Sequence, residues 1–317
     1  MKDKGLLGNI HPALKLLVLA MLSFISLAII TFIGIIFAFI FFDTSIVMQM
    51  LEGGMDLMSN IEFGKYVQML SHLGMFVVPA ILFAYLVGKN IKKYLSVDKK
   101  PDMKQVFLGI CLVVASFPLI GFLLEINMKL SLPEFLAPLE RWIYSSEEAA
   151  QLLTDKFLSV TTTKGLIINI LLIAVLPAFG EEFIFRGALM RTLKQWTNNA
   201  HLAVWLSAII FSAIHIQFLG FLPRLFLGAL FGYMVMYSGS LWIAIIAHFV
   251  NNAIAVVAFY FYHNNYTNVQ LEEISKGQSG LVYILISIIL ISLLMFAYWR
   301  IGRINEEKLK STVEETD

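Results

Sequence analysis

Three short stretches of the sequence combine ionisable and amide side chains that could take part in acid–base chemistry. They contain Glu181, Glu182 and Arg186 in the first stretch, His215 in the second, and His248 and Asn252 in the third. Each stretch lies in an apolar run long enough to cross a lipid bilayer. Ionisable side chains at bilayer depth are costly and usually face the bundle interior, where they serve a function. The sequence therefore predicts a chemically active site inside the membrane.

Helical geometry separates the two neighbouring glutamates. Successive residues of a helix are rotated by about 100° around its axis. Glu182 and Arg186 are four residues apart and therefore share a face where an ion pair can form. Glu181 points about 100° away from that face. The pair of Glu182 and Arg186 is therefore interpreted as structural support, and Glu181 is interpreted as the glutamate that takes part in the chemistry. Pro177 has no N–H for the carbonyl of Ile173 and is expected to kink the helix before the pair.

The acid–base residues of the three stretches can reach one depth in the bilayer. Counted at about 1.5 Å per residue, Glu181 and His248 each lie about 14–15 Å from the cytoplasmic edge. His215 reaches the same level if Trp205 marks the membrane interface. His248 and Asn252 are four residues apart and share a helix face. One carboxylate, two imidazoles and one amide can thus converge.

This set of groups is suited to peptide hydrolysis in either of two ways. A partly desolvated Glu181 beside a histidine can deprotonate water, while a second histidine and the Asn252 amide hold the oxyanion. Alternatively, Glu181, His215 and His248 are three zinc ligands, with water in the open position. The spacing differs from H-E-x-x-H, in which both histidines share one helix, so a simple zincin site is excluded. The residues themselves leave the two mechanisms open.

The elements that must position these residues are membrane helices. Of the 317 residues, 59% are hydrophobic and 14% are charged, and the mean hydropathy of +0.79 lies outside the soluble range. The net charge of +1 gives no reason to expect nucleic acid as a partner. About eight apolar runs could each cross the bilayer, at 16–42, 66–88, 106–128, 165–190, 202–219, 223–238, 241–263 and 280–299. We expect an all-α polytopic membrane protein, one domain over 1–317, with its active site between helices 4, 5 and 7.

Orientation follows from the positive charges. Most of the 23 Lys and Arg residues fall in the segments that are cytoplasmic if the N-terminus is inside. Both termini are therefore predicted to be cytoplasmic, with the site in the cytoplasmic half of the bilayer. The largest outer loop, 129–164, is expected to hold an amphipathic helix on the outer surface, with a simple connector as the alternative. Arg224 is interpreted as an interfacial anchor at the outer end of the sixth run, and His72 as an interhelical hydrogen-bonding residue.

At these residues the chain resembles the CPBP family of intramembrane endopeptidases, the CAAX prenyl protease and bacteriocin-processing group, also called Abi. The family signature is E-E-x-x-x-R, F-x-x-x-H and H-x-x-x-N on three separate membrane helices. It stands here as Glu181-Glu182-Phe-Ile-Phe-Arg186, Phe211-Ser-Ala-Ile-His215 and His248-Phe-Val-Asn-Asn252. The resemblance covers a catalytic core at about 165–260 and implies eight membrane helices.

The resemblance also implies a mechanism and a class of substrate. It implies hydrolysis by glutamate-activated water without a metal cofactor, with Glu181 as the base, His215 assisting, and His248 and Asn252 holding the oxyanion. Phe211 is expected to pack beside His215. The implied partners are the lipid bilayer and a membrane-associated or lipidated protein or peptide, and the implied location is a bacterial cell membrane.

Two other classes of protein could use the same residues. A proton-coupled transporter can place Glu and His at mid-depth, but related half-repeats with broken helices are not visible in the sequence. A non-enzymatic immunity or interaction protein could keep the fold. It would have no reason to bear the desolvation cost of Glu181, His215 and His248.

Overall fold

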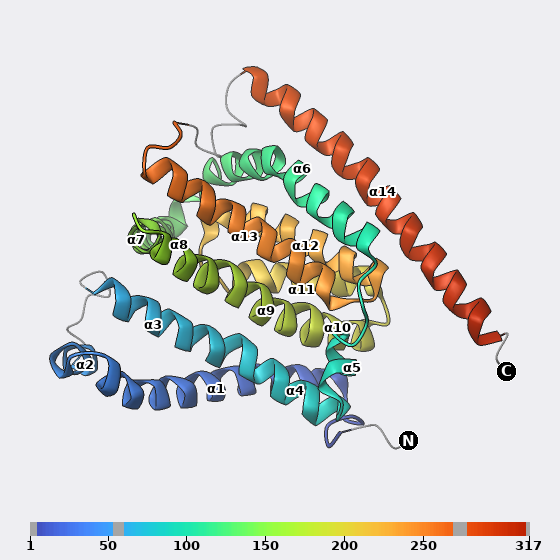
Figure 1. Ribbon diagram of the computed structural model, residues 1–317, viewed down its shortest axis with the longest axis horizontal. Coiled ribbons are helices and arrows are strands. Elements are labelled where there is room, and N and C mark those ends of the chain that lie inside the picture. Colours follow the sequence, from blue (N-terminus) through green and yellow to red (C-terminus); the bar gives the residue numbers. More distant parts are fainter. Residues whose placement is uncertain (1–4, 53–59, 269–277, 315–317) are drawn as a thin grey trace.

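The computed structural model describes residues 5–52, 60–268 and 278–314, and within these ranges the regular elements are all helical (Figure 1). The first half contains α1 (Pro12–Phe41), α2 (Thr44–Leu51), α3 (Ile61–His72), α4 (Val78–Gly88), α5 (Ile91–Leu95), α6 (Met103–Met128) and α7 (Ala137–Leu158). The second half contains α8 (Thr163–Asn169), α9 (Leu176–Glu182), α10 (Met190–Thr197), α11 (Ala200–Ala213), α12 (Phe221–Ser238), α13 (Leu241–His263) and α14 (Gln278–Glu314). The expected all-α class is confirmed.

Seven helices in the described ranges are long and apolar enough to cross a membrane. They are Pro12–Phe41, Ile61–Gly88, Met103–Met128, Thr163–Thr197, Phe218–Ser238, Leu241–His263 and Gly280–Asn305. The shorter apolar helix Ala200–Ala213 stands in the place of the expected fifth span. The prediction of about eight membrane helices is therefore close to what the structure shows.

Two of these spans contain π-helical turns, in which backbone bonds join residues five apart. The second span runs through α3, η1 (Leu73–Val77) and α4, and the fourth through α8, η3 (Ile170–Val175), α9, η4 (Phe183–Leu189) and α10. Pro79 and Pro177 each lie in the first turn of the α-helix that follows a π segment, where a missing N–H is tolerated. Single π turns inside α-helices often mark functional sites. In the fourth span, η3 precedes the helix that carries Glu181 and Glu182, and η4 follows it.

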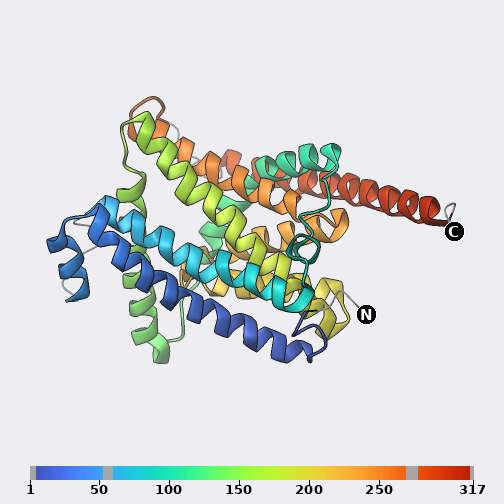
Figure 2. The same ribbon diagram turned by 60° about the horizontal axis from the view of Figure 1, so that its bottom comes forward.

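The fourth span is the centre of the bundle. In Figure 1 α9 lies between α3 on one side and α13 on the other, and α9 contacts both. One apolar cluster joins α1, α4, α5, η4 and α13, and a second joins α6, α12, α13 and α14. Figure 2 shows α1 and α14 on opposite sides of the bundle. The glutamates are thus held at a position covered by helices from several directions.

The fifth apolar run departs from the prediction. Helix α11 ends at Ala213 after 14 residues, about 21 Å, although the run was expected to continue as a helix to residue 219. The backbone leaves the helix at Ile214, turns through a positive φ of 54° at Ile216, and re-enters a helix through the 3₁₀ turn η5 (Phe218–Gly220). His215 therefore lies in a connection and not on a membrane helix. Non-helical backbone at membrane depth is tolerated where it lines a cavity inside the protein.

The long loop between the third and fourth spans contains α7, a 22-residue helix with one buried residue, Phe157. Apolar side chains such as Trp142 and Leu152 are exposed along it. The 3₁₀ turn η2 (Glu134–Leu136) precedes it, and α7 contacts α3, α8, α13 and η5. The helix therefore packs against the second and fourth spans, against α13, and against the connection that follows α11.

Reporter fusions test the predicted orientation of this bundle. Fusions after Lys100 and after Lys310 should report cytoplasm, because the segments rich in Lys and Arg stay inside. A fusion near Ser145 of α7 should report the outer side. A reporter that is active outside when fused after Lys100 would reverse the predicted topology.

Candidate active site between the membrane helices

One cavity of about 370 Å³ lies among α3, α9, α12, α13 and the connection after α11. Its polar lining consists of Gln68, His72, Glu181, His215, Arg224, His248, Asn251 and Asn252. Its apolar lining consists of Phe76, Ile173, Pro177, Phe211, Ile214, Leu227 and Phe231. All four residues predicted from sequence to act in catalysis therefore face the same space.

Glu181 is buried in this wall, with only 6% of its surface exposed. His72 Nε2 lies 3.4 Å from one of its carboxylate oxygens, and His248 Nε2 lies 3.8 Å from the other. The first distance permits charge interaction, although the two groups are not aligned as a hydrogen bond. Gly180 allows this approach, because a Cβ there would meet Val77 at 3.0 Å and the His72 ring at 3.3 Å. The carboxylate is therefore flanked by two imidazoles from different helices.

Glu182 forms the ion pair that its spacing predicts. Its Oε1 accepts a hydrogen bond from Arg186 Nη1 at 2.8 Å, and Arg186 Nη2 donates to the carbonyl of Gly228 at 2.9 Å. The guanidinium also lies over the ring of Phe211, 4.8 Å from its centroid. Glu182 is fully buried and Arg186 is 2% exposed, and neither lines the cavity. The pair is thus turned away from the cavity, as expected.

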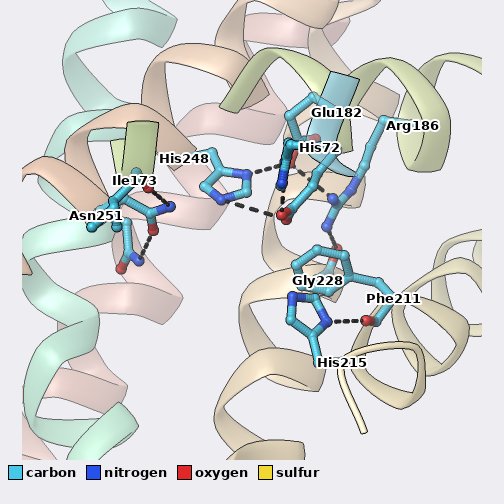
Figure 3. Close-up of polar contacts among 11 residues, drawn as sticks. His72, Ile173, Glu182, Arg186, Phe211, His215, Gly228, His248 and Asn251 are labelled. Atoms are coloured by element: carbon cyan, nitrogen blue, oxygen red, sulfur yellow. Dashed lines mark hydrogen bonds and ion pairs between the residues drawn. The ribbon is translucent and has the colours of Figure 1, made fainter. Parts of the chain in front are cut away.

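His248 connects the two glutamates. Its Nδ1 lies 2.9 Å from Oε1 of Glu182, the oxygen that already accepts from Arg186 (Figure 3). An ionised carboxylate can only accept, so we assign the proton to His248 Nδ1. Nε2 of the same ring then faces Glu181. Glu182 therefore orients His248 in addition to neutralising Arg186, a role that the helical spacing did not reveal.

His215 is oriented by the backbone of the helix before it. Its Nδ1 lies 2.7 Å from the carbonyl oxygen of Phe211, which can only accept, so Nδ1 carries the proton (Figure 3). Nε2 is then the ring nitrogen available to the cavity. The Phe211 ring packs against His215 edge to face, with centroids 5.0 Å apart. His215 shares the cavity with Glu181, but its hydrogen bond runs to Phe211.

Asn252 is held from two directions. Its Nδ2 donates to the carbonyl of Ile173 at 3.0 Å, and its Oδ1 accepts from Asn251 Nδ2 at 3.0 Å. The Ile173 carbonyl is the one that Pro177, four residues later, cannot reach with an N–H. Asn252 therefore compensates for the proline, and one N–H of its amide remains for the cavity.

Four polar cavity residues were not assigned to the site from sequence: Gln68, His72, Arg224 and Asn251. His72 was expected to make only an interhelical hydrogen bond, Arg224 was expected to anchor at the interface, and Asn251 was not distinguished from its neighbour. Arg224, interpreted from the sequence as an interfacial anchor, lines the cavity in the structure. The position of His72 within an apolar run was the sequence signal for this further imidazole beside Glu181.

The zinc alternative depends on the arrangement of the donors. Among the residues that the structure describes, no group of three or more His, Cys, Asp or Glu side chains is placed to hold a metal ion. Nδ1 of His215 is bonded to Phe211 and Nδ1 of His248 to Glu182, which leaves Nε2 of both rings facing the cavity, an arrangement that suits either mechanism. The absence of a metal cofactor therefore stays a prediction, and no step below passes through a metal.

Comparison with known proteins agrees with this geometry. Residues 163–254 match the family model of type II CAAX prenyl endopeptidase Rce1-like proteins. This segment, called the Rce1-like segment below, is therefore similar to that family. The Rce1-like segment begins with α8 and ends inside α13, so it contains Glu181, His215, His248 and Asn252. His72, by contrast, comes from outside the Rce1-like segment.

A curated relative matches a somewhat longer part of the chain. The uncharacterized protein YpbD of Bacillus subtilis (strain 168) is 30% identical over 105 residues, which are 32% of this chain and 51% of the relative. The chain thus spans about half the length of that relative. No solved structure matches the chain significantly.

Proposed function

We propose that the chain is an intramembrane endopeptidase that hydrolyses a peptide bond of a membrane-associated or lipidated protein or peptide. One observation carries the proposal: a nearly inaccessible carboxylate, Glu181, lies between His72 and His248 in a cavity that His215 and Asn252 also line. The similarity of residues 163–254 to a family of endopeptidases supports it. We place the protein in a bacterial cell membrane, with both termini and the site on the cytoplasmic side.

Glu181 is the general base in this proposal. Its carboxylate takes a proton from a water molecule, and the water oxygen attacks the carbonyl carbon of the scissile peptide bond. His215 assists, because Nε2 is an acceptor when Nδ1–H is bonded to Phe211. Glu181 then passes the proton to the amide nitrogen, the C–N bond breaks, and a carboxylic acid and an amine are released.

The oxyanion is held by donors on α13. Asn252 has one N–H left after its bond to Ile173, and protonated His248 presents Nε2–H to the cavity. The two ring nitrogens of His248 are directed at carboxylates, Nδ1 at Glu182 behind the ring and Nε2 at Glu181 in front of it. Donors fixed in place before reaction stabilise developing charge more than mobile water does.

Comparison of membrane peptides tests the proposal. Cells that produce the wild-type chain, cells that produce Glu181→Gln and cells without the chain would be compared for the ends of membrane proteins and short peptides. We expect new peptide ends only with the wild type. Identical peptide ends in all three samples would remove the endopeptidase function and favour a transporter or an immunity protein.

Chelation separates the water mechanism from the zinc alternative. We expect EDTA or 1,10-phenanthroline to leave cleavage by the purified chain unchanged, and elemental analysis to find less than one zinc per chain. The reason is that Asn252 is a poor zinc ligand but a good oxyanion donor. Loss of cleavage on chelation, recovered by added zinc, would assign Glu181, His215 and His248 to a metal.

A further inference from the structure

Arg224 faces the cavity, unlike Arg186, and its positive charge is not paired with a carboxylate. Arg224, in the first turn of α12, lines the cavity together with Glu181 and His215. Its guanidinium donates to the side-chain and backbone oxygens of Gln217, both of which are neutral. Its Nε is buried without a hydrogen-bond partner among the described residues. An arginine inside a bundle of membrane helices normally has an acidic partner or a function.

Arg186 shows what a fully satisfied arginine looks like in the same bundle. Arg186 binds the Glu182 carboxylate and the Gly228 carbonyl and is enclosed by aromatic rings. Arg224, in contrast, takes part in none of the ion pairs between described residues. Glu147 and Glu181 act on its charge only through space. A fixed positive charge therefore remains at the wall of the cavity.

A glycine creates the space in which this guanidinium lies. A Cβ added to Gly220 would come within 2.6 Å of Arg224 Nη1 and 3.0 Å of Nη2. Replacing Gly220 by alanine would therefore displace the head group while keeping its charge. Apolar lining residues, among them Phe76 and Leu227, complete the wall around it. The cavity thus offers a cationic fork beside an apolar surface.

We propose that Arg224 is a specificity residue that binds a carboxylate of the substrate. The inference rests on the proposed function and deepens it. A guanidinium binds a carboxylate through two parallel N–H bonds, a stronger arrangement than its present bonds to neutral oxygens. The Arg224 guanidinium would also offset the repulsion between the substrate carboxylate and the Glu181 carboxylate in the same cavity. The carboxylate belongs either to the C-terminus of the substrate or to an acidic side chain.

Binding of short peptides to the full chain in nanodiscs tests this assignment. The probes are N-acetyl-leucyl-leucyl-alanine with a free carboxylate, the same peptide as its C-terminal amide, and the amidated peptide with aspartate in place of the central leucine. They are measured on Glu181→Gln, so that cleavage does not consume them. A hydrogen bond to a charged group contributes about 1.5–3 kcal/mol, so we expect the free carboxylate to bind about 10–100-fold more tightly than the amide.

The variants decide whether Arg224 is responsible. Adding Arg224→Gln should abolish the preference, Gly220→Ala should weaken it, and Arg141→Gln, an exposed arginine of α7, should leave it unchanged. Tight binding of the aspartyl peptide as well would assign acidic side chains as a source, and its weak binding would assign the C-terminus. Thermal unfolding of each variant confirms that it is folded.

Two outcomes would overturn the assignment. One is equal binding of all three peptides, or no binding of any of them at millimolar concentration. The other is a preference that survives Arg224→Gln. The two proposals fail separately: carboxylate binding without any cleavage by the wild type refutes the endopeptidase and keeps the subsite, whereas cleavage indifferent to Arg224 refutes the subsite alone.

Discussion

Glu181→Gln should lower kcat by about 10²–10⁴-fold while the protein remains folded, because glutamine keeps the size and much of the hydrogen bonding of the side chain but cannot accept the proton. The measurement is single-turnover cleavage, in nanodiscs, of a substrate found by the peptide comparison. A Glu181→Gln variant that keeps more than about a tenth of wild-type kcat would refute its role as the base.

The same substitution one residue later should have a different result. Glu182→Gln leaves Arg186 buried without its counter-charge, and breaking a buried ion pair by removing one partner typically costs about 3–5 kcal/mol. We therefore expect a lower thermal midpoint and less folded protein in the membrane. Loss of the acceptor for His248 Nδ1 adds to the effect.

Glu181→Gln is the matched control for this second prediction, since the two variants differ only in position. The double variant Glu182→Gln with Arg186→Met should recover part of the lost stability, because it also removes the unpaired charge. A Glu182→Gln protein with wild-type thermal stability would show that the pair contributes little. The two adjacent glutamates would then not divide into one that acts and one that supports.

The sequence predicted those parts of the fold that depend on periodicity along one helix. Hydropathy located the spans because each helix must satisfy its own backbone in lipid. The spacing of Glu182 and Arg186 predicted their ion pair, because residues four apart are neighbours on any helix. These inferences need no knowledge of which helices are adjacent.

Contacts between helices were beyond the same reasoning. His72 and Glu181 are brought together by the packing of η1 against Gly180, which the sequence does not specify. Hydropathy also could not detect that α11 ends at Ala213, because the connection that follows remains apolar whether or not it is helical. The positions of His215 and Arg224 therefore came only from the structure.

The hydrogen bond from Asn252 to the Ile173 carbonyl has a mechanical consequence. It ties α13 to the part of the fourth span that precedes Pro177, whereas Glu181 lies on the part that follows. Proline and π turns are the places where a helix bends most readily. A change in the bend angle at Pro177 would move the Glu181 carboxylate relative to the Asn252 amide and would therefore change the distance between these two groups across the cavity.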